Sequence, residues 1–242
     1  MQIPIDGTVT RIGDRKGLLW CKADMKIHTS FYPRFDDLPR SLPIFSLENA
    51  LVLPGVDLPL NIFEPRYLNM VADVLKTHRM FGLIQPDTAS GVQGALYATG
   101  CAGRITSYAE TEDGRVLLVL TGVIRFAVLE ELAGIRGYRT IVPSWNAYRT
   151  DLNQHLEGEI RDRLRLTSAL SRYLRERNMT TDWEKLIALP GPHLVNTMTT
   201  LLPLGSAEKQ AILEAHGPER REALFIAALE TAFQDGAGAT RH

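Results

Sequence analysis

The spacing of apolar residues changes near residue 150, and this change sets the strongest limit on the fold. Before residue 146, apolar residues come in short runs broken by proline and glycine, and Ile124, Phe126 and Val128 alternate with other residues. After Asp151 they recur every three or four positions. Alternation is the period of a half-buried strand, whereas recurrence every three to four residues is that of an amphipathic helix. The sequence therefore predicts an α+β chain, with a β-rich half followed by a helical half.

The β-rich half contains several predicted strands and one predicted helix. The proline-broken apolar run 51–55 is expected to form a strand. Pro65 should take the first position of a helix, where its missing N–H costs no hydrogen bond. Asp113-Gly114 lies between two apolar segments and is typical of a hairpin turn. The segment 138–145 is expected to be the last strand.

The helical half is expected to contain four helices. The first should be long and should bury one apolar stripe, made of Leu156, Ile160, Leu164, Leu170 and Leu174. Pro203 should end the second helix, Ser206 is suited to cap the third, and Gly217-Pro218 should separate the third from the fourth. The fourth should bury a face made of Phe225, Ala228, Leu229, Ala232 and Phe233.

No motif in the sequence indicates catalysis. None of the 19 glycines is followed by lysine, so the Gly-Lys step of a phosphate-binding P-loop is missing. The six histidines are scattered and show no metal-ligand spacing. Cys101 lies between two small residues, where a buried thiol is expected, and a hydrolase using this thiol is the least favoured function. We expect no catalytic residue, no metal and no cofactor.

Charge gives no general attraction to nucleic acid or to a membrane surface. The chain has 27 Lys and Arg residues against 28 Asp and Glu residues, a net charge of -1. Arginines are dense between 161 and 177, but Glu157, Asp162 and Glu176 are interleaved with them. Such mixing is typical of a solvent-exposed, ion-paired helix face. No apolar run approaches the length needed to span a bilayer, so we expect no membrane partner and regard nucleic acid as an unfavoured one.

The run 42–71, LPIFSLENALVLPGVDLPLNIFEPRYLNMV, resembles the N-terminal, substrate-binding domain of the ATP-dependent protease Lon. That family's pattern is LPIFPL, then an apolar run with PG, then LPLxIFEPRY; Ser46 stands where the family usually has proline. The resemblance continues in order at 100–105, 112–115, 120–126, 194–197 and 208–214. It implies a PUA-like β-barrel followed by a C-terminal α-helical bundle.

The resemblance also implies a function. It predicts a non-enzymatic module that binds unfolded or degradation-marked protein segments and works with a separate protease or ATPase, because no ATPase or protease motif is found in the chain. An RNA-binding PUA-like module is the alternative, since such barrels also bind RNA as a class. The near-neutral charge argues against RNA, because phosphate contacts need clustered Lys and Arg.

Five motif residues are the candidate binding residues: Glu64, Arg66, Tyr67, Arg125 and Phe126. A structural role competes with binding at each of them and is favoured for most. Pro65 fixes φ at the start of the helix, and Tyr67 should pack inward. Glu64 and Arg125 are expected to pair across the barrel.

These observations predict four parts of the chain. Residues 1–38 should be a poorly structured leader, 39–148 the PUA-like β-rich domain, 149–235 the helical bundle, and 236–242 a flexible tail. Met25 is a candidate for the physiological start, since 1–24 show no periodicity. Two cysteines 80 positions apart favour reduced thiols and a cytoplasmic protein.

Overall fold

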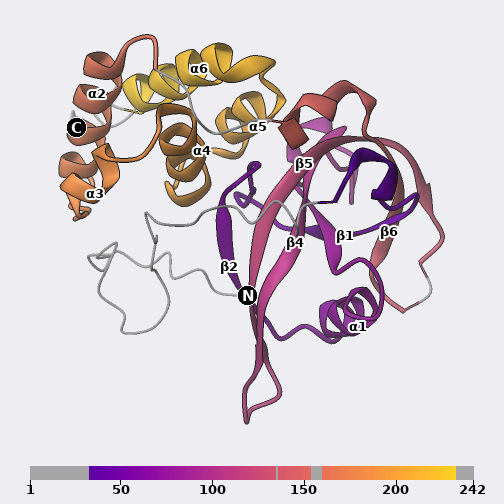
Figure 1. Ribbon diagram of the computed structural model, residues 1–242. Coiled ribbons are helices and arrows are strands. Elements are labelled where there is room, and N and C mark those ends of the chain that lie inside the picture. The colour runs from indigo at the N-terminus through magenta and orange to yellow at the C-terminus, as the bar shows by residue number, and fades with distance from the viewer. Residues whose placement is uncertain (1–32, 135, 154–159, 233–242) are drawn as a thin grey trace. The chain divides into compact units, whose positions relative to one another are not determined.

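The computed structural model describes residues 33–134, 136–153 and 160–232 (Figure 1). These residues form two compact units, which separate near residue 154 and are considered one at a time. The proposed start at Met25, the terminal tail and Phe233 lie outside the described residues. No described helix is both long enough and apolar enough to cross a membrane.

The first unit is built on one mixed sheet. Its described strands are β1 (Leu42–Ser46), β2 (Asp57–Ile62), β3 (Met80–Ile84), β4 (Thr99–Glu110), β5 (Val116–Leu132) and β6 (Arg139–Ser144). The order is β2-β5-β4-β3-β1-β6, and β6 also pairs with β5, so that hydrogen bonding runs round a closed ring of five strands. Only β1 and β3 pair in parallel among the described strands.

The turn between β4 and β5 follows the sequence prediction. Gly114 has φ 78°, a left-handed conformation that glycine adopts without a Cβ clash. The Thr111 N–H donates to the Arg115 carbonyl at 3.0 Å and closes the hairpin. The predicted last strand is confirmed as β6.

The predicted strand at 51–55 is wrong. Leu51, Val52 and Leu53 are buried but irregular, because the chain turns at Gly55 instead of continuing into a ladder. Gly55 has φ 77° and donates to the Gly122 carbonyl at 2.9 Å. The β5 backbone approaches so closely that a Cβ on Gly122 would lie 2.1 Å from the Leu53 carbonyl oxygen.

Helix α1 (Pro65–Val74) begins at the predicted proline and buries Tyr67, Met70, Val71 and Val74. Leu38, in the predicted leader, is also buried and belongs to a core cluster with Leu42, Ile44 and Phe126. That cluster includes Tyr148, which lies in the short 3-10 segment η4 (Asn146–Asn153). Residues 149–153, assigned from the sequence to the helical half, therefore pack with the first unit.

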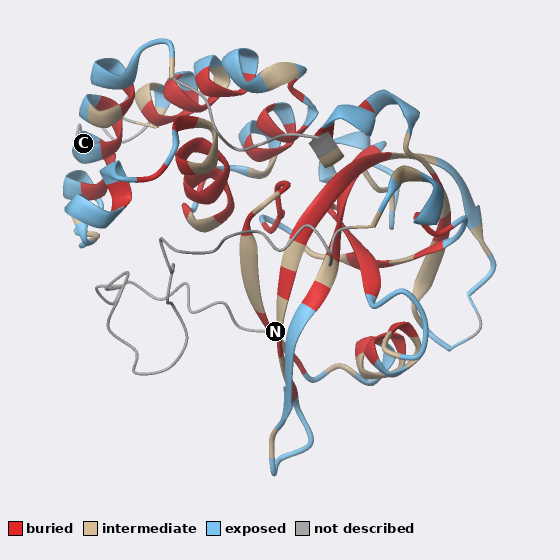
Figure 2. Ribbon diagram, viewed as in Figure 1, coloured by how far each residue is buried: buried red, intermediate tan, exposed pale blue. Residues whose placement is uncertain are grey.

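The second unit consists of helices α2 (Arg163–Glu176), α3 (Trp183–Ile187), α4 (Gly191–Leu201), α5 (Ser206–Glu214) and α6 (Gly217–Thr231). They surround one apolar cluster, and α6 packs against α2, α4 and α5. Phe225, Ala228 and Leu229 are buried in it, as predicted for the last helix. In Figure 2, α4 is red along much of its length, as befits the helix nearest the centre of this unit. The α+β class is thus confirmed.

The stripe predicted for the first of these helices is only partly right. Leu170 and Leu174 are buried, but Leu164 is 82% exposed. Leu156, the first residue of the predicted stripe, lies outside the described residues. Helix α2 begins directly after Asp162, which caps it by accepting from the Arg165 N–H at 3.0 Å. The buried face is then centred on Leu166, Leu170 and Tyr173, and Leu164 is about 200° away from Leu166 on the helix.

Two other predictions about the helices differ from the structure. Gly205, not Ser206, is the residue before α5, and no side chain caps that helix. The short helix α3 was not predicted; Asp182 caps it by accepting from the Lys185 N–H at 3.2 Å.

Candidate functional site

Three of the five candidate binding residues lie together at the start of α1. The Glu64 carboxylate accepts from the Arg66 Nε at 2.9 Å and pairs with its Nη2 at 2.8 Å. The Arg66 guanidinium lies 4.5 Å from the centre of the Tyr67 ring. Tyr67 is buried and donates through its hydroxyl to the Ser46 carbonyl at 3.3 Å. Glu64 and Arg66 therefore place a paired charge at the surface, while Tyr67 fastens α1 to β1.

The hollow beside this cluster is closed. It lies among Phe45, Asn61, Phe63 and Tyr67 and has no room for a water molecule. Burial raises the pKa of Tyr67 above its ordinary value, despite the neighbouring Arg66 charge, which lowers it. Phe63 is the only one of these aromatic side chains with substantial exposure, 39%. The start of α1 thus offers a small surface contact and no pocket.

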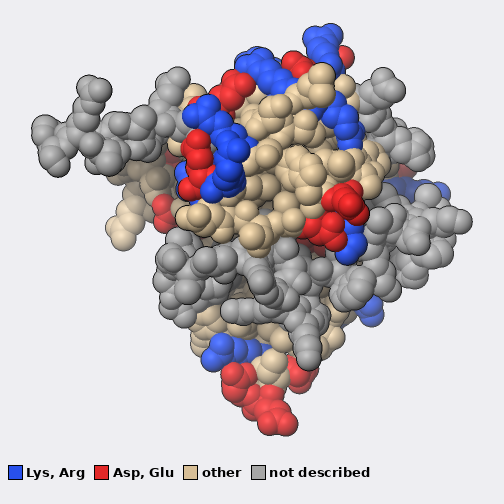
Figure 3. Space-filling model, turned by 90° about the vertical axis from the view of Figure 1, so that its left-hand side faces the viewer, with Lys and Arg blue, Asp and Glu red and all other residues tan. Residues whose placement is uncertain are grey.

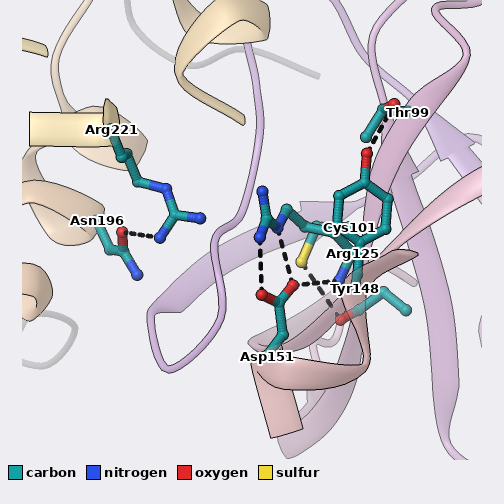
Figure 4. A network of polar contacts seen from close by, with 8 residues as sticks. Thr99, Cys101, Arg125, Tyr148, Asp151, Asn196 and Arg221 are labelled. Atoms are coloured by element: carbon teal, nitrogen blue, oxygen red, sulfur yellow. Dashed lines mark hydrogen bonds and ion pairs between the residues drawn. The ribbon is translucent and has the colours of Figure 1, made fainter. Parts of the chain in front are cut away.

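Arg125 is held in a buried network of the first unit (Figure 4). Its Nε and Nη2 each donate to the Asp151 carboxylate at 2.8 Å, and its backbone N–H donates to the same group at 3.1 Å. The guanidinium also lies 4.5 Å from the centre of the Tyr148 ring. Burial alone lowers the pKa of Arg125, but the hydrogen bonds and charge of Asp151 outweigh this and raise it above its ordinary value.

The predicted pairing of Glu64 with Arg125 is wrong. Arg125 pairs with Asp151, and Glu64 pairs with Arg66. Arg125 is only 2% exposed, because Asp151 and Tyr148 of η4 lie against its side chain. The position of Asp151, 26 residues further along the chain, carries no local signal that could have identified the partner.

Phe126 belongs to the core. It is fully buried and meets Trp145 edge to face, with ring centres 6.0 Å apart. Its ring fills the space left by Gly100, where an added Cβ would lie 2.5 Å from it. Any contact that Arg125 or Phe126 makes with a partner must therefore be indirect, through the surface that they support.

Cys101 and possible metal ligands were the remaining candidates for chemistry in the described residues. Cys101 is fully buried on β4, and its thiol donates to the Ala102 carbonyl, with the sulfur 3.6 Å from the oxygen. No cluster of three or more histidine, cysteine or acidic side chains suited to a metal ion occurs in the described parts. The structure therefore directs attention to surfaces on which another molecule can lie.

A more open depression lies in the second unit, between α2 and α3. This groove has a volume of about 640 Å³ and is lined by Arg163, Leu164, Thr167, Ser168, Ser171, Arg172, Arg175, Trp183 and Ile187. Its two most exposed apolar side chains are Leu164, at 82%, and Ile187, at 37%. Figure 3 looks onto the side of this unit that carries α2 and α3 and shows a wide uncharged area bordered by charged side chains.

Arg161 and Arg165, which lie outside the groove, are ion-paired, as predicted for the arginine-dense segment. Arg165 pairs with Glu230 at 2.7 Å, and Arg161 with Glu219 at 3.3 Å. The hydrogen bonds that Arg165 donates to Glu230 raise the pKa of Arg165, which remains charged. These pairs leave no continuous row of unpaired cations along the described part of α2.

The sequence did not reveal this groove, for two reasons. One wall is α3, a five-residue helix too short to show a period. The other wall carries Leu164, which the extended stripe had assigned to the core. The available signal was Asp182, which is a good capping residue placed directly before Trp183.

The chain is similar to known proteins of one family. A family model described as the ATP-dependent protease La (LON) substrate-binding domain matches residues 41–231. The Lon protease of Parabacteroides distasonis is 26% identical over 182 residues, which cover 72% of this chain and 22% of that protein. Lon protease 2 of Myxococcus xanthus is 25% identical over 201 residues, which cover 79% and 24%. The chain thus spans about a quarter of the length of these relatives.

Two solved structures resemble this one. The first is the crystal structure of a Lon N-terminal domain protein from Xanthomonas campestris, with a TM-score of 0.56 and 25% identity, covering 77% of this chain and 97% of that one. The second is the N-terminal domain of Mycobacterium avium complex Lon protease, with a TM-score of 0.53. The second is 15% identical and supports the fold alone, over 78% of this chain and 98% of that one.

Proposed function

Because the chain belongs to the family of the ATP-dependent protease La (LON) substrate-binding domain, we propose that it binds unfolded or degradation-marked segments of other proteins. The observation that carries this proposal is the extent of the family match, 41–231, which includes most of both compact units. The family match and the surfaces of the described residues support this function, whereas the fold alone would not fix it.

The proposed role is non-enzymatic. The matching family model is that of a substrate-binding domain, and the described residues offer no catalytic cluster. We propose that a separate protease or ATPase receives the bound protein. The cytoplasm is the proposed compartment, in keeping with the free thiol of the buried Cys101.

We also propose the finer description of the fold, a PUA-like β-barrel followed by a C-terminal helical bundle. The closed hydrogen-bonded ring β5-β4-β3-β1-β6 supports the barrel. The single apolar cluster enclosed by α2, α4, α5 and α6 supports the bundle.

Among the candidate binding residues, Glu64 and Arg66 have exposed side chains and are proposed as direct contacts. Tyr67, Arg125 and Phe126 are proposed to act by holding that surface in place, because each is at least 95% buried.

The test is binding to one polypeptide in two states. Fluorescently labelled ribonuclease A, either native or reduced and carboxymethylated, is titrated with the protein, and anisotropy is measured. We expect binding to the unfolded form and none to the native form. Equal binding to both forms, or to neither, would contradict the proposal. A parallel assay should give no ATP hydrolysis above a buffer blank.

RNA binding remains the second candidate, because arginines are dense on α2 and PUA-like barrels as a class bind RNA. The ion pairs of Arg161 and Arg165 argue against it. A labelled single-stranded RNA, titrated at 50 and 200 mM NaCl, separates the two candidates. Tight, strongly salt-dependent RNA binding without binding to the unfolded protein would favour RNA.

A further inference from the structure

We propose that the groove between α2 and α3 binds an acidic polypeptide segment that carries an apolar side chain. This inference rests on the proposed function and specifies which segments the protein selects. It is argued from the shape of the groove, from its exposed apolar residues and from the sign of its charges.

The shape of the groove follows from one face of α2. Leu164, Ser168, Ser171 and Arg175 are spaced by four, three and four residues, and therefore lie in one line along the helix. The two serine side chains are short, so the surface of α2 is depressed in the middle of this line and raised at its two ends. Leu164 and Arg175 are eleven residues apart, which is about 16 Å along a helix. A five-residue extended segment or a three-turn helix spans that distance.

The end of the groove near Leu164 is apolar. Leu164 is 82% exposed and Ile187 37% exposed, and Trp183 lines the same groove from α3. The Arg163 guanidinium donates to the Ile187 carbonyl and so ties α2 to the end of α3. Because this bond holds both walls, the apolar end is formed before any partner arrives, and it fits an apolar side chain.

The lining of the groove is positively charged. It includes Arg163, Arg172 and Arg175, and no acidic side chain is among the described residues that line it. The Arg172 Nε forms an ion pair with the Glu176 carboxylate at 2.9 Å, one turn further along α2. Arg175 makes no ion pair with any described residue, and it stands at the end opposite Leu164. Carboxylates are therefore the groups that this end of the groove fits best.

Acidic protein is favoured over other occupants. Residues 1–32 carry five Lys and Arg against three Asp, so charge does not draw them to this groove. A second copy would have to offer an exposed acidic and apolar segment. RNA is acidic too, but it lacks an aliphatic side chain to match Leu164. These occupants are outcomes of the test below.

The experiment measures binding of three labelled 15-residue peptides by anisotropy at 50 mM NaCl. Each carries one leucine, followed by four Glu, four Gln or four Lys within five residues. We expect the Glu peptide to bind about tenfold tighter than the Gln peptide, and the Lys peptide to bind weakest. Raising NaCl to 500 mM should remove most of that preference, because exposed charges are screened.

Two variants and two matched controls locate the binding. Arg175→Glu should weaken the Glu peptide about tenfold and should strengthen the Lys peptide. Leu164→Ser should weaken all three peptides by a similar factor. Arg220→Glu makes the same charge change on α6, and Leu129→Ser removes another exposed leucine, 67% exposed on β5; neither should alter binding. All four positions are exposed, and thermal unfolding confirms that each variant folds.

The inference is overturned if the peptides bind alike, or if Arg175→Glu and Leu164→Ser bind as the unaltered protein does. In that second case, retained binding to unfolded ribonuclease A would leave the proposed function standing and move its site elsewhere. If the unaltered protein does not bind unfolded ribonuclease A, the proposed function itself is wrong. RNA binding stronger than Glu-peptide binding, or a dimer that Leu164→Ser dissociates, would assign the groove to another occupant.

Discussion

Asp151→Asn tests whether the buried Arg125–Asp151 pair holds the first unit together. Asp151 is 4% exposed and Arg125 2%, and three hydrogen bonds of 2.8 to 3.1 Å join them. The substitution keeps the shape of the side chain but leaves the guanidinium charge buried without its counter-charge. Breaking one side of a buried ion pair costs about 3–5 kcal/mol, so we expect a loss of about 3 kcal/mol in the free energy of unfolding.

The measurement is urea unfolding at pH 7, followed by fluorescence. Replacing Trp20 and Trp183 by Phe leaves Trp145, which belongs to the first unit, as the reporter. Glu131→Gln is the matched control, because Arg139 holds Glu131 at 2.5–2.6 Å in the same unit but near the surface. An exposed pair contributes about 0.2–1 kcal/mol. If Asp151→Asn costs no more than Glu131→Gln, the buried pair does not have the role assigned to it.

Three further predictions concern stability. Leu166→Ala should cost about 2–5 kcal/mol by urea unfolding, because its side chain is fully buried, whereas Leu164→Ala should cost under about 0.5 kcal/mol. Burial lowers the pKa of Lys209 to about 8 from 10.5, so the folded state binds fewer protons than the unfolded state between these pH values. Lys209→Met should therefore raise the free energy of unfolding by up to about 3 kcal/mol below pH 8, and by progressively less as the pH rises toward 10.5. Gly122→Ala should cost more than about 3 kcal/mol in urea unfolding, because the added Cβ would collide with the Leu53 backbone. At Gly114 an added Cβ would meet nothing within 4 Å, so Gly114→Ala should cost only the strain of its positive φ, about 1–2 kcal/mol.

Features with a local cause were predictable from the sequence. Pro65 begins α1 because only the first turn of a helix tolerates its missing N–H. Gly114 makes the hairpin turn because its φ of 78° excludes most other residues. Pro65 lies in the Lon-like run 42–71 and Gly114 in the later motif 112–115, and these motifs together indicated the family, which the match over 41–231 confirms.

Features that depend on distant partners were not predictable. The run 51–55 resembles a strand in sequence, but its conformation is set by the backbone of Gly122, a residue of β5, which accepts from the Gly55 N–H. Arg125 was expected to pair with Glu64, and its partner is instead Asp151. Which residues of α2 are buried depends on where the helix begins, directly after Asp162. The apolar spacing in the sequence continues across this position and gives no sign of the start. In each case, the energy that decides the conformation comes from a contact that periodicity does not encode.

The strength of binding in the groove follows from the same contacts. A fully buried leucine contributes about 1.5–3 kcal/mol, so covering Leu164, part of Ile187 and one ligand side chain contributes about 4–7 kcal/mol. Exposed ion pairs at Arg172 and Arg175 add about 0.2–1 kcal/mol each. Association costs at least about 4 kcal/mol, so the net binding free energy is at most about 5 kcal/mol, which corresponds to a dissociation constant of about 0.2 mM or weaker. A site of that strength releases its segment quickly, which suits the proposed transfer of bound protein to a separate protease. Titration of the Glu peptide should therefore give a dissociation constant above about 0.1 mM. A micromolar or tighter value would require a second contact surface, for which Glu64 and Arg66 are the first residues to substitute.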